Sequence, residues 1–274
     1  MKMNTEKVAQ DVISQMQRDY LATLTGPQDA YWQEGLIASS DHLEIRIEGR
    51  QAGYFVLDPE NQMMQFHLTE RFHRDAPNLL KQVLESHGVK TALAATIEPF
   101  YFSLCLDLQQ KAQVHTYLFS DHSKREPVLS TITGHLFRKA TSDDLAKVVP
   151  LFGGGDEFVD LETIEANFGG PLGYAKMVIE AGILHVLEKD SEILGTGEFR
   201  ERKTWVPFAD VGMIVNKEYR RQGVGTYLLA LLKQKADRQG LKPICSCEAG
   251  NLGSRKAVEN AGFIARHRVV QFSF

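Results

Sequence analysis

Residues 215–226 of the 274-residue chain read VNKEYRRQGVGT, and this stretch decides the fold. A strand-like apolar run ends at Val215, and a long helical pattern follows from Gly225 to Gln239. The two glycines, Gly223 and Gly225, let the backbone turn sharply and approach a ligand without Cβ clashes. Free amides at the start of the helix favour a phosphate, and two arginines add charge beside them. The stretch therefore predicts an anion-binding turn, better suited to a diphosphate than to a carboxylate.

Three other interpretations compete for this turn. A nucleotide P-loop would need the pattern GxxxxGKS or GxxxxGKT, but no Gly-Lys pair follows Gly223. A dinucleotide-binding GxGxxG would need glycine at Leu228 and the opening strand of a βαβ unit. The third is purely structural: a strand-to-helix turn softened by glycine, with solvated arginines. That third alternative stays open at the level of sequence.

The turn and two further blocks resemble the GNAT superfamily of acyl-CoA-dependent N-acetyltransferases. The Arg-x-x-Gly-x-Gly pattern at 220–225 matches the family signature between its fourth strand and the following helix. Residues 251–263 (NLGSRKAVENAGF) resemble a late family block, and residues 137–145 (FRKATSDDL) resemble its first strand and helix. The resemblance covers residues 136–274 and implies an α/β fold, with a mixed α+β sheet, that performs acyl transfer.

The resemblance also implies acetyl-CoA as co-substrate and a set of residues that would hold it. Backbone amides of the turn would hold the CoA pyrophosphate. The end of the fourth strand would pair with the pantetheine arm like an added strand, and the thioester would lie where the fourth and fifth strands splay apart. A strand amide near Met213 would then stabilise the oxyanion. The implied CoA-binding residues are Met213, Ile214, Val215, Arg220, Arg221, Gln222, Gly223, Val224, Gly225, Thr226, Asn251 and Ser254.

The groups that would move protons are less well defined. Family members often carry a tyrosine acid seven residues after the asparagine, but Val258 stands at that position. Some members carry a glutamate base where this chain has Ser246. Three carboxylates near the strand ends are the candidates for a catalytic base: Glu248, Asp210 and Glu198. The alternative for each of them is a solvated charge at a strand end.

The first half of the chain repeats the order of elements of the second. Residues 79–90 (LLKQVLESHGVK) align without gaps on residues 231–242 (LLKQKADRQGLK). Upstream of this block the first half is five residues shorter, and the missing residues correspond to 222–226. We therefore expect two GNAT-like domains in tandem: a degenerate one at 1–127, which lacks a pyrophosphate loop, and an acetyltransferase domain at 128–274. An unrelated α+β domain is the alternative for the first half.

Hydrophobic periodicity predicts the elements around these blocks. The predicted helices cover residues 5–24, 76–87, 100–106, 143–151, 161–181 (interrupted at 169–171), 225–239 and 253–260. The predicted strands cover residues 42–47, 53–57, 63–68, 91–96, 114–119, 136–140, 184–188, 193–199, 209–215, 243–248 and 263–272.

Composition sets the broad class of the protein. The formal net charge of −4 argues against an electrostatic nucleic-acid binder. Three cysteines, an odd number without metal-site spacing, predict a reducing compartment, no disulfide framework and no metal. Apolar runs fall short of the ~18 residues that a membrane span needs. We expect a cytoplasmic, metal-free protein without nucleic-acid or membrane partners, and a homodimer stays open.

The sequence thus predicts an N-acetyltransferase that transfers an acetyl group from acetyl-CoA to a primary amine of a small-molecule or peptide acceptor by direct attack. Residues 153–160 (GGGDEFVD) fall where the family has its variable substrate loop. Asp156, Glu157 and Asp160 would receive a cationic amine there, unless the segment is only a solvated acidic loop. A non-catalytic acyl-CoA-binding or regulatory module is the alternative function, because the tyrosine acid is missing and the base is undecided.

Overall fold

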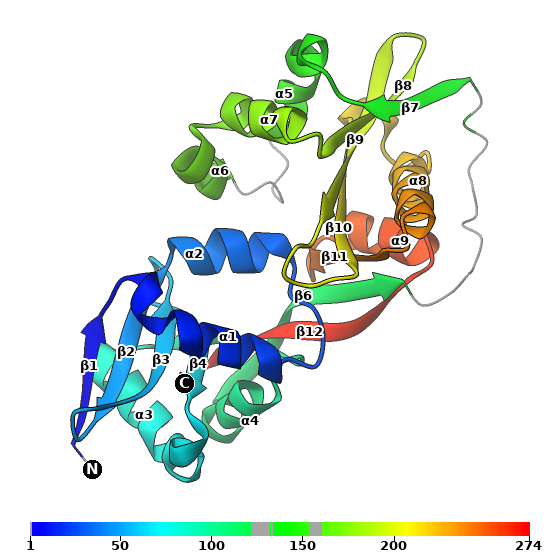
Figure 1. The fold of residues 1–274 in the computed structure, drawn as a ribbon. Helices are drawn as coiled ribbons and strands as arrows, with labels where there is room; N and C mark the ends of the chain where they lie inside the picture. The colour runs from blue at the N-terminus through cyan, green and yellow to red at the C-terminus, as the bar shows by residue number, and fades with distance from the viewer. Residues whose placement is uncertain (1, 122–131, 133, 154–160) are drawn as a thin grey trace. The chain divides into compact units, whose positions relative to one another are not determined.

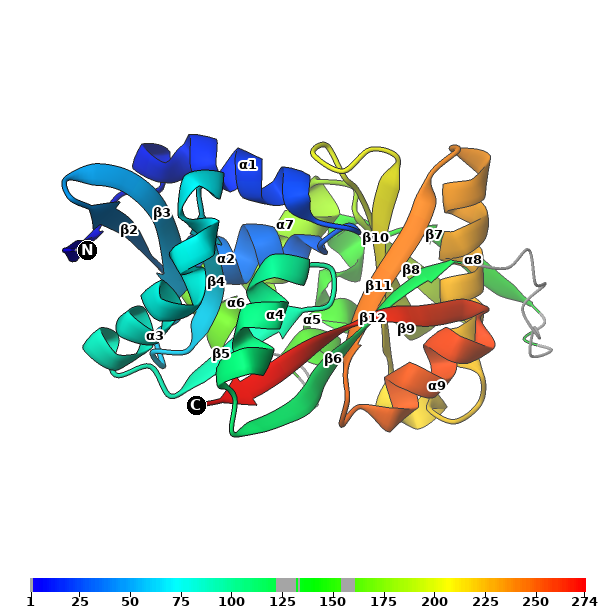
Figure 2. The ribbon, with the colours of Figure 1, turned by 90° about the horizontal axis from the view of Figure 1, so that it is seen from below.

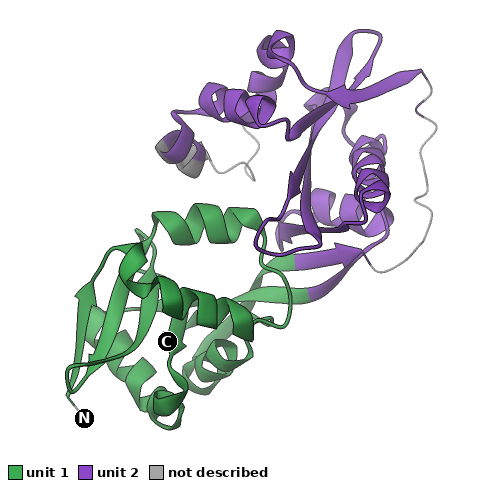
Figure 3. Ribbon diagram, in the orientation of Figure 1, with its two compact units in different colours: residues 1–117, 267–274 green, residues 118–266 purple. Residues whose placement is uncertain are grey.

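The structure, a computed structural model, describes residues 2–121, 132, 134–153 and 161–274. The chain forms two compact units (Figure 3): unit 1 comprises residues 1–117 and 267–274, and unit 2 comprises residues 118–266. Two strands, β6 (Lys111–Asp121) and β12 (Phe263–Ser273), contribute residues to both units. The boundary expected after residue 127 lies outside the described residues.

Unit 1 is built on a mixed sheet. Neighbouring strands are antiparallel except for β4 and β5, which run parallel. The far end of the chain completes this sheet, because β12 pairs with β5 and brings Val269 opposite Ala95. The strands lie in the order β1 (Met3–Lys7), β2 (Asp41–Ile47), β3 (Arg50–Leu57), β4 (Met63–Leu68), β5 (Thr91–Ala95) and β12.

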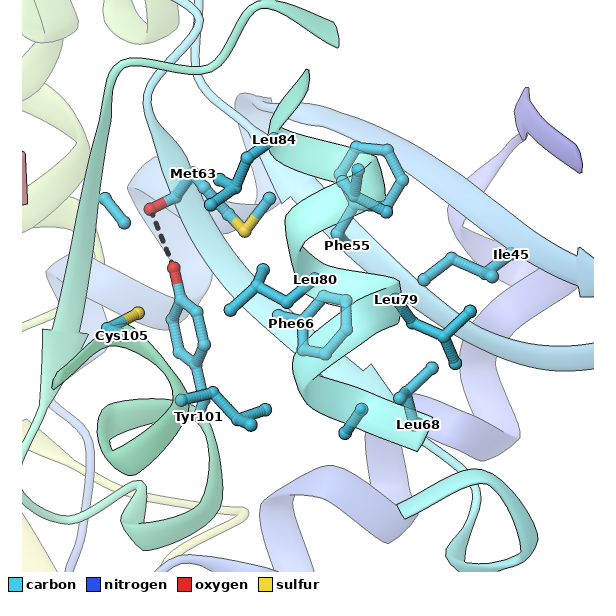
Figure 4. Close-up of a cluster of buried hydrophobic side chains, with 14 of the residues drawn as sticks. Ile45, Phe55, Met63, Phe66, Leu68, Leu79, Leu80, Leu84, Tyr101 and Cys105 are labelled. Atoms are coloured by element: carbon cyan, nitrogen blue, oxygen red, sulfur yellow. Dashed lines mark hydrogen bonds between the residues drawn. The ribbon is translucent and has the colours of Figure 1, made fainter. Parts of the chain in front are cut away.

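The apolar core of unit 1 lies between one face of this sheet and helices α3 (Ala76–His87) and α4 (Pro99–Leu108), as Figure 4 shows. Side chains alternate across a strand, so Phe55 and the directly opposite Phe66 point to the same face. Leu80 of α3 is fully buried against them. The helix predicted at residues 76–87 is therefore confirmed, and its apolar side chains pack in the core.

The opposite face of the same sheet is polar, although it too is buried. Tyr54 and His67 lie directly opposite each other on β3 and β4, and both rings contact Tyr20 of helix α1 (Ser14–Thr23). Tyr20 also donates its hydroxyl hydrogen to Glu98, which accepts the backbone N–H of Ala95 with its other oxygen. Burial raises the pKa of the Glu98 carboxyl to about 8.

A pH-dependent stability follows from Glu98. Its pKa is near 4.5 in an unfolded chain and about 8 in the fold, so the folded state holds a proton that the unfolded state loses between those values. The contribution of Glu98 to the free energy of unfolding is therefore complete below pH 4.5 and is lost as the pH rises to about 8. We expect the Glu98→Gln variant to gain stability over the parent chain as the pH rises from 5 to 9. Urea unfolding at pH 5, 7 and 9 measures this difference, and a constant difference would contradict it.

Unit 2 is also a mixed sheet with helices on both faces. Its strands lie in the order β11 (Lys242–Glu248), β10 (Phe208–Val215), β9 (Glu192–Glu201), β8 (Leu184–Lys189) and β7 (His135–Lys139). Helix α8 (Val224–Arg238) packs on one face, where its leucines approach the glycines of β9. Helices α5 (Leu145–Gly153) and α7 (Pro171–Glu180) cover the other face. Figures 1 and 2 show these elements in two views.

Most predicted elements are present with ends that differ by a few residues, and the helical segment 161–181 divides at Gly169–Gly170 into α6 (Leu161–Phe168) and α7. The start of the first predicted helix was wrong. Residues 3–7 form strand β1, which pairs antiparallel with β2, and the α-helix begins only at Ser14. The edge-strand partner overrides the helical spacing, because Met3 packs against the core of unit 1. The connection around Trp32 is helical as well, through residues 31–39.

No helix among the described residues is long and apolar enough to cross a membrane.

Candidate active site

Strands β10 and β11 of unit 2 form a fork. They pair in parallel only from Phe208–Asp210 against Lys242–Ile244, and no later pairs join them among the described residues. On its other side β10 stays paired with β9 as far as Val215. The backbone of residues 211–215 is therefore open toward β11, and an extended chain can add to it as a strand does. The predicted CoA-binding residues Met213, Ile214 and Val215 lie on this arm.

The glycine turn follows directly at the end of the open arm. Two residues adopt the left-handed conformation, Arg221 at φ 61° and Gly223 at φ 83°, before α8 begins at Val224. Arg220 donates from Nε to the carbonyl of Val215 (3.2 Å), which ties the turn to β10. The first amides of α8 have no acceptor within the helix, so they are available to an anion.

The geometry leaves little room between this turn and the strand. A Cβ on Gly225 would lie 3.2 Å from the Met213 sulfur and 3.3 Å from Val215 Cγ2. Glycine thus lets the first turn of α8 pack directly on the open arm of β10. The structure places the predicted turn residues directly after that arm, between β10 and the first turn of α8: Arg220, Arg221, Gln222, Gly223, Val224, Gly225 and Thr226. These residues fit a diphosphate joined to an extended chain.

Asn251 and Ser254 lie at the start of helix α9 (Leu252–Asn260). Asn251 Oδ1 accepts a hydrogen bond from the backbone N–H of Ser254 (2.9 Å), so this side chain caps the helix. The amide nitrogen of Asn251 is the end that fits the expected contact with the pantetheine arm. Val258, at the position where relatives often have tyrosine, is buried.

The three candidate bases lie in different surroundings. Glu198 on β9 accepts a 2.7 Å hydrogen bond from the Tyr174 hydroxyl, and its side chain is 24% exposed. Burial raises the pKa of the Glu198 carboxyl, although Tyr174 and Arg200 counteract part of that effect. Asp210 forms an ion pair of 3.2 Å with the buried Arg202. Glu248 lies exposed at the end of β11.

Glu198 is the candidate that faces open space beside the fork. It lies directly opposite Gly212 in the β9–β10 register, two positions beyond the last pair between β10 and β11. No heavy atom of the described residues lies within 4 Å of the place where a Cβ on Gly212 would be. Because Asp210 and Gly212 alternate with Met213, they share the face of Glu198, opposite the face covered by α8. A small group between Glu198 and the open arm would thus meet a carboxylate.

Two residues of this site were missed by the sequence reasoning: Tyr174 and Arg200. The Arg200 guanidinium lies 3.7 Å from the Glu198 carboxylate. The sequence signal for Tyr174 is the Gly-Gly-Pro interruption just before it, which predicts a break in the helix. The acidic residues Asp156, Glu157 and Asp160, predicted to receive the amine, lie outside the described residues.

Unit 1 has the same framework without the turn. Here a 3₁₀ helix (Glu70–Asp75) joins β4 directly to α3, and all of residues 69–76 are described and keep negative φ. Strands β4 and β5 share a single parallel pair, Met63 with Ala92. At that fork the hydroxyl of Tyr101 donates to the carbonyl of Met63 (3.2 Å; Figure 4). Ser254 stands at the equivalent third position after the helix cap in unit 2.

Comparisons with known families match both halves. Residues 9–122 match the family described as "Acetyltransferase (GNAT) domain", and residues 159–263 match "Acetyltransferase (GNAT) family". A search of curated proteins found no match.

Solved structures similar to this chain include tandem arrangements. A GNAT-family acetyltransferase from Colwellia psychrerythraea is 25% identical, with a TM-score of 0.85 and 100% of both chains covered. A tandem GNAT protein from the clavulanic acid biosynthesis pathway is 14% identical, with a TM-score of 0.63 over 100% of this chain and 98% of that one. A GCN5-related N-acetyltransferase from Sphaerobacter thermophilus is 13% identical, with a TM-score of 0.64 over 98% and 94%. The last two show the fold alone.

Proposed function

Because the chain belongs to the GNAT acetyltransferase family, with two GNAT domains in tandem, we propose that unit 2 transfers an acetyl group from acetyl-CoA to a primary amine. The acceptor is a small molecule or a peptide. The observation that carries this proposal is the fork of β10 and β11, which ends in a glycine turn and has the half-buried Glu198 carboxylate beside it.

The donor half of the proposal rests on the backbone. The amides of residues 221–226 would hold the pyrophosphate of acetyl-CoA at the start of α8, where the helix dipole favours negative charge. The open arm of β10 would pair with the pantetheine, and the thioester would then lie beside Gly212 and Met213. A backbone amide of the arm near Met213 would then stabilise the oxyanion.

The acceptor half rests on Glu198. Its carboxylate would take a proton from the amine, directly or through one water, as the nitrogen attacks the thioester carbonyl. The new C–N bond forms while the C–S bond breaks, and CoA leaves as a thiolate that is protonated from solvent. We favour Glu198 over Asp210 because Arg202 already pairs with Asp210, and over Glu248 because Glu248 is exposed at the end of β11.

The test is turnover. Acetyl-CoA incubated with the protein and a panel of amines and short peptides should release free thiol above the rate without protein, and mass spectrometry should find the acetylated amine. Tight binding of CoA without turnover across the panel would instead favour a non-catalytic acyl-CoA-binding module.

The tandem arrangement makes a separate prediction about stoichiometry. In unit 1 the turn lacks glycine and Tyr101 binds the backbone at the fork, so we propose that this copy does not bind CoA in the manner of unit 2. Calorimetric titration with CoA should give one site per chain. Two equivalent sites would contradict the assignment of unit 1 as degenerate.

A further inference from the structure

Tyr174 is held in place by both of its neighbouring helices. Its ring makes edge contacts with Phe152 of α5 and Phe168 of α6, each at a centroid distance of 5.1 Å. Helix α7 approaches α6 so closely that a Cβ on Gly173 would lie 1.7 Å from the carbonyl oxygen of Phe168. Only glycine fits there, and the next residue is the tyrosine. The residues around the helix break therefore fix one ring, with its hydroxyl directed at Glu198.

One hydrogen bond joins Tyr174 to Glu198, and Tyr174 also interacts with Arg200. The Tyr174 hydroxyl donates to Oε1 of Glu198 at 2.7 Å, across 24 residues of sequence. The other oxygen, Oε2, lies 3.7 Å from Arg200, which is beyond hydrogen-bond distance. One oxygen of the carboxylate is thus fixed by a neutral donor, and the other faces the Arg200 guanidinium in a longer ion pair.

A hydroxyl that donates to a carboxylate stabilises its ionised form. Burial acts in the opposite direction and raises the pKa of Glu198, so the Tyr174 hydrogen bond opposes the protonation that would disable a base. Arg200 contributes in the same sense as Tyr174. From α7, β8, β9 and β10, the polar groups facing Glu198 in the described residues are Tyr174, Arg200 and the Arg202–Asp210 pair.

We propose that Tyr174 is a positioning residue of the acetyl-transfer reaction: it orients Glu198 and keeps it ionised at neutral pH. This inference rests on the proposed function, because it assigns a role within the same site. The tyrosine lies on the helix that covers the acceptor side of the sheet, so it acts on the base rather than on the leaving thiolate.

The experiment compares the pH dependence of kcat/KM in the parent chain and in Tyr174→Phe, which keeps the ring and removes only the hydroxyl. Loss of a hydrogen bond to a charged group predicts a rate about tenfold lower at pH 7. The acid limb of the profile should move to higher pH, and the ratio of the two rates should return to within about twofold near pH 9.5, where the carboxylate is ionised in both proteins. KM for acetyl-CoA should not change.

Tyr54→Phe is the matched control, because Tyr54 is a buried tyrosine of unit 1 whose hydroxyl donates to Gln65. This variant removes a tyrosine hydroxyl that lies outside the site, so it should leave the pH profile of kcat/KM unchanged. A loss in Tyr174→Phe that is equal at every pH, or no loss at all, would overturn the inference.

A failure of the proposed function has a different signature. It would appear as an absence of turnover in the parent chain, whatever Tyr174 does. In that case ¹³C NMR titration of the Glu198 carboxyl in the parent chain and in Tyr174→Phe still decides the inference, because the variant should titrate at higher pH. Identical titrations would overturn it.

Discussion

Gly223→Trp is expected to weaken CoA binding about 100-fold. The residue has φ 83°, a conformation that costs a side-chain-bearing residue about 1–2 kcal/mol, and the new indole would stand at the mouth of the turn. Losing two hydrogen bonds from the turn to a charged phosphate, about 1.5 kcal/mol each, weakens binding about 100-fold. Calorimetric titration with CoA measures the loss directly, and circular dichroism checks that the fold is kept.

The control for this variant lies at the other end of the same helix. Gly240, just past α8, has φ 69°, and in the part of the chain that the structure describes no heavy atom lies within 4 Å of its Cβ position. Gly240→Trp therefore carries the same substitution and a similar backbone strain, away from the turn. It should bind CoA as the parent chain does. If Gly223→Trp binds as tightly as Gly240→Trp, the pyrophosphate does not lie at the start of α8.

The second large effect is expected from Glu198→Gln. The amide keeps the size of the side chain and can still accept the Tyr174 hydrogen bond, but it cannot take a proton from the amine. Loss of a general base lowers the rate by about 10²–10³. The decrease should appear in kcat, with KM for acetyl-CoA unchanged, because the β10 arm and the turn are untouched.

Two further variants test whether the decrease in rate is specific to Glu198. Glu192→Gln removes an exposed carboxylate from the same strand and should keep the parent rate. Glu248→Gln tests the competing candidate at the end of β11. Should the large decrease occur in Glu248→Gln and not in Glu198→Gln, the base has been assigned to the wrong strand.

The cofactor side of the site could be predicted from sequence because its signal is local. Gly223 and Gly225 are two residues apart, and the apolar residues that follow them repeat with a clear helical period. The same locality made the repeat visible, since residues 79–90 and 231–242 each form the later part of one helix and the turn after it. Constraints on backbone conformation depend on adjacent residues, so a short sequence motif can reveal them.

The acceptor side could not be predicted in the same way. Tyr174 and Glu198 belong to different elements, and only the packing of α7 on the sheet brings the two together. Sequence reasoning therefore placed Glu198 among three equal candidates and missed the tyrosine. Strand β1 illustrates the same difficulty, because the residues Met3–Lys7 do not indicate which strand they pair with. Their partner β2 lies 40 residues further on.

The pairing of β12 with β5 also determines when the fold of unit 1 can be completed during translation. Unit 1 needs residues 267–274, which are made only after all 149 residues of unit 2 (118–266) have been added. At the roughly 5–20 residues per second of protein synthesis, β5 waits on the order of ten seconds for its neighbour. During that interval Thr91–Ala95 has an unpaired edge, which is where a nascent chain is most prone to pair with another molecule. The first domain to be translated is thus the last to be finished, and a gene cut between the two halves would never supply its missing strand.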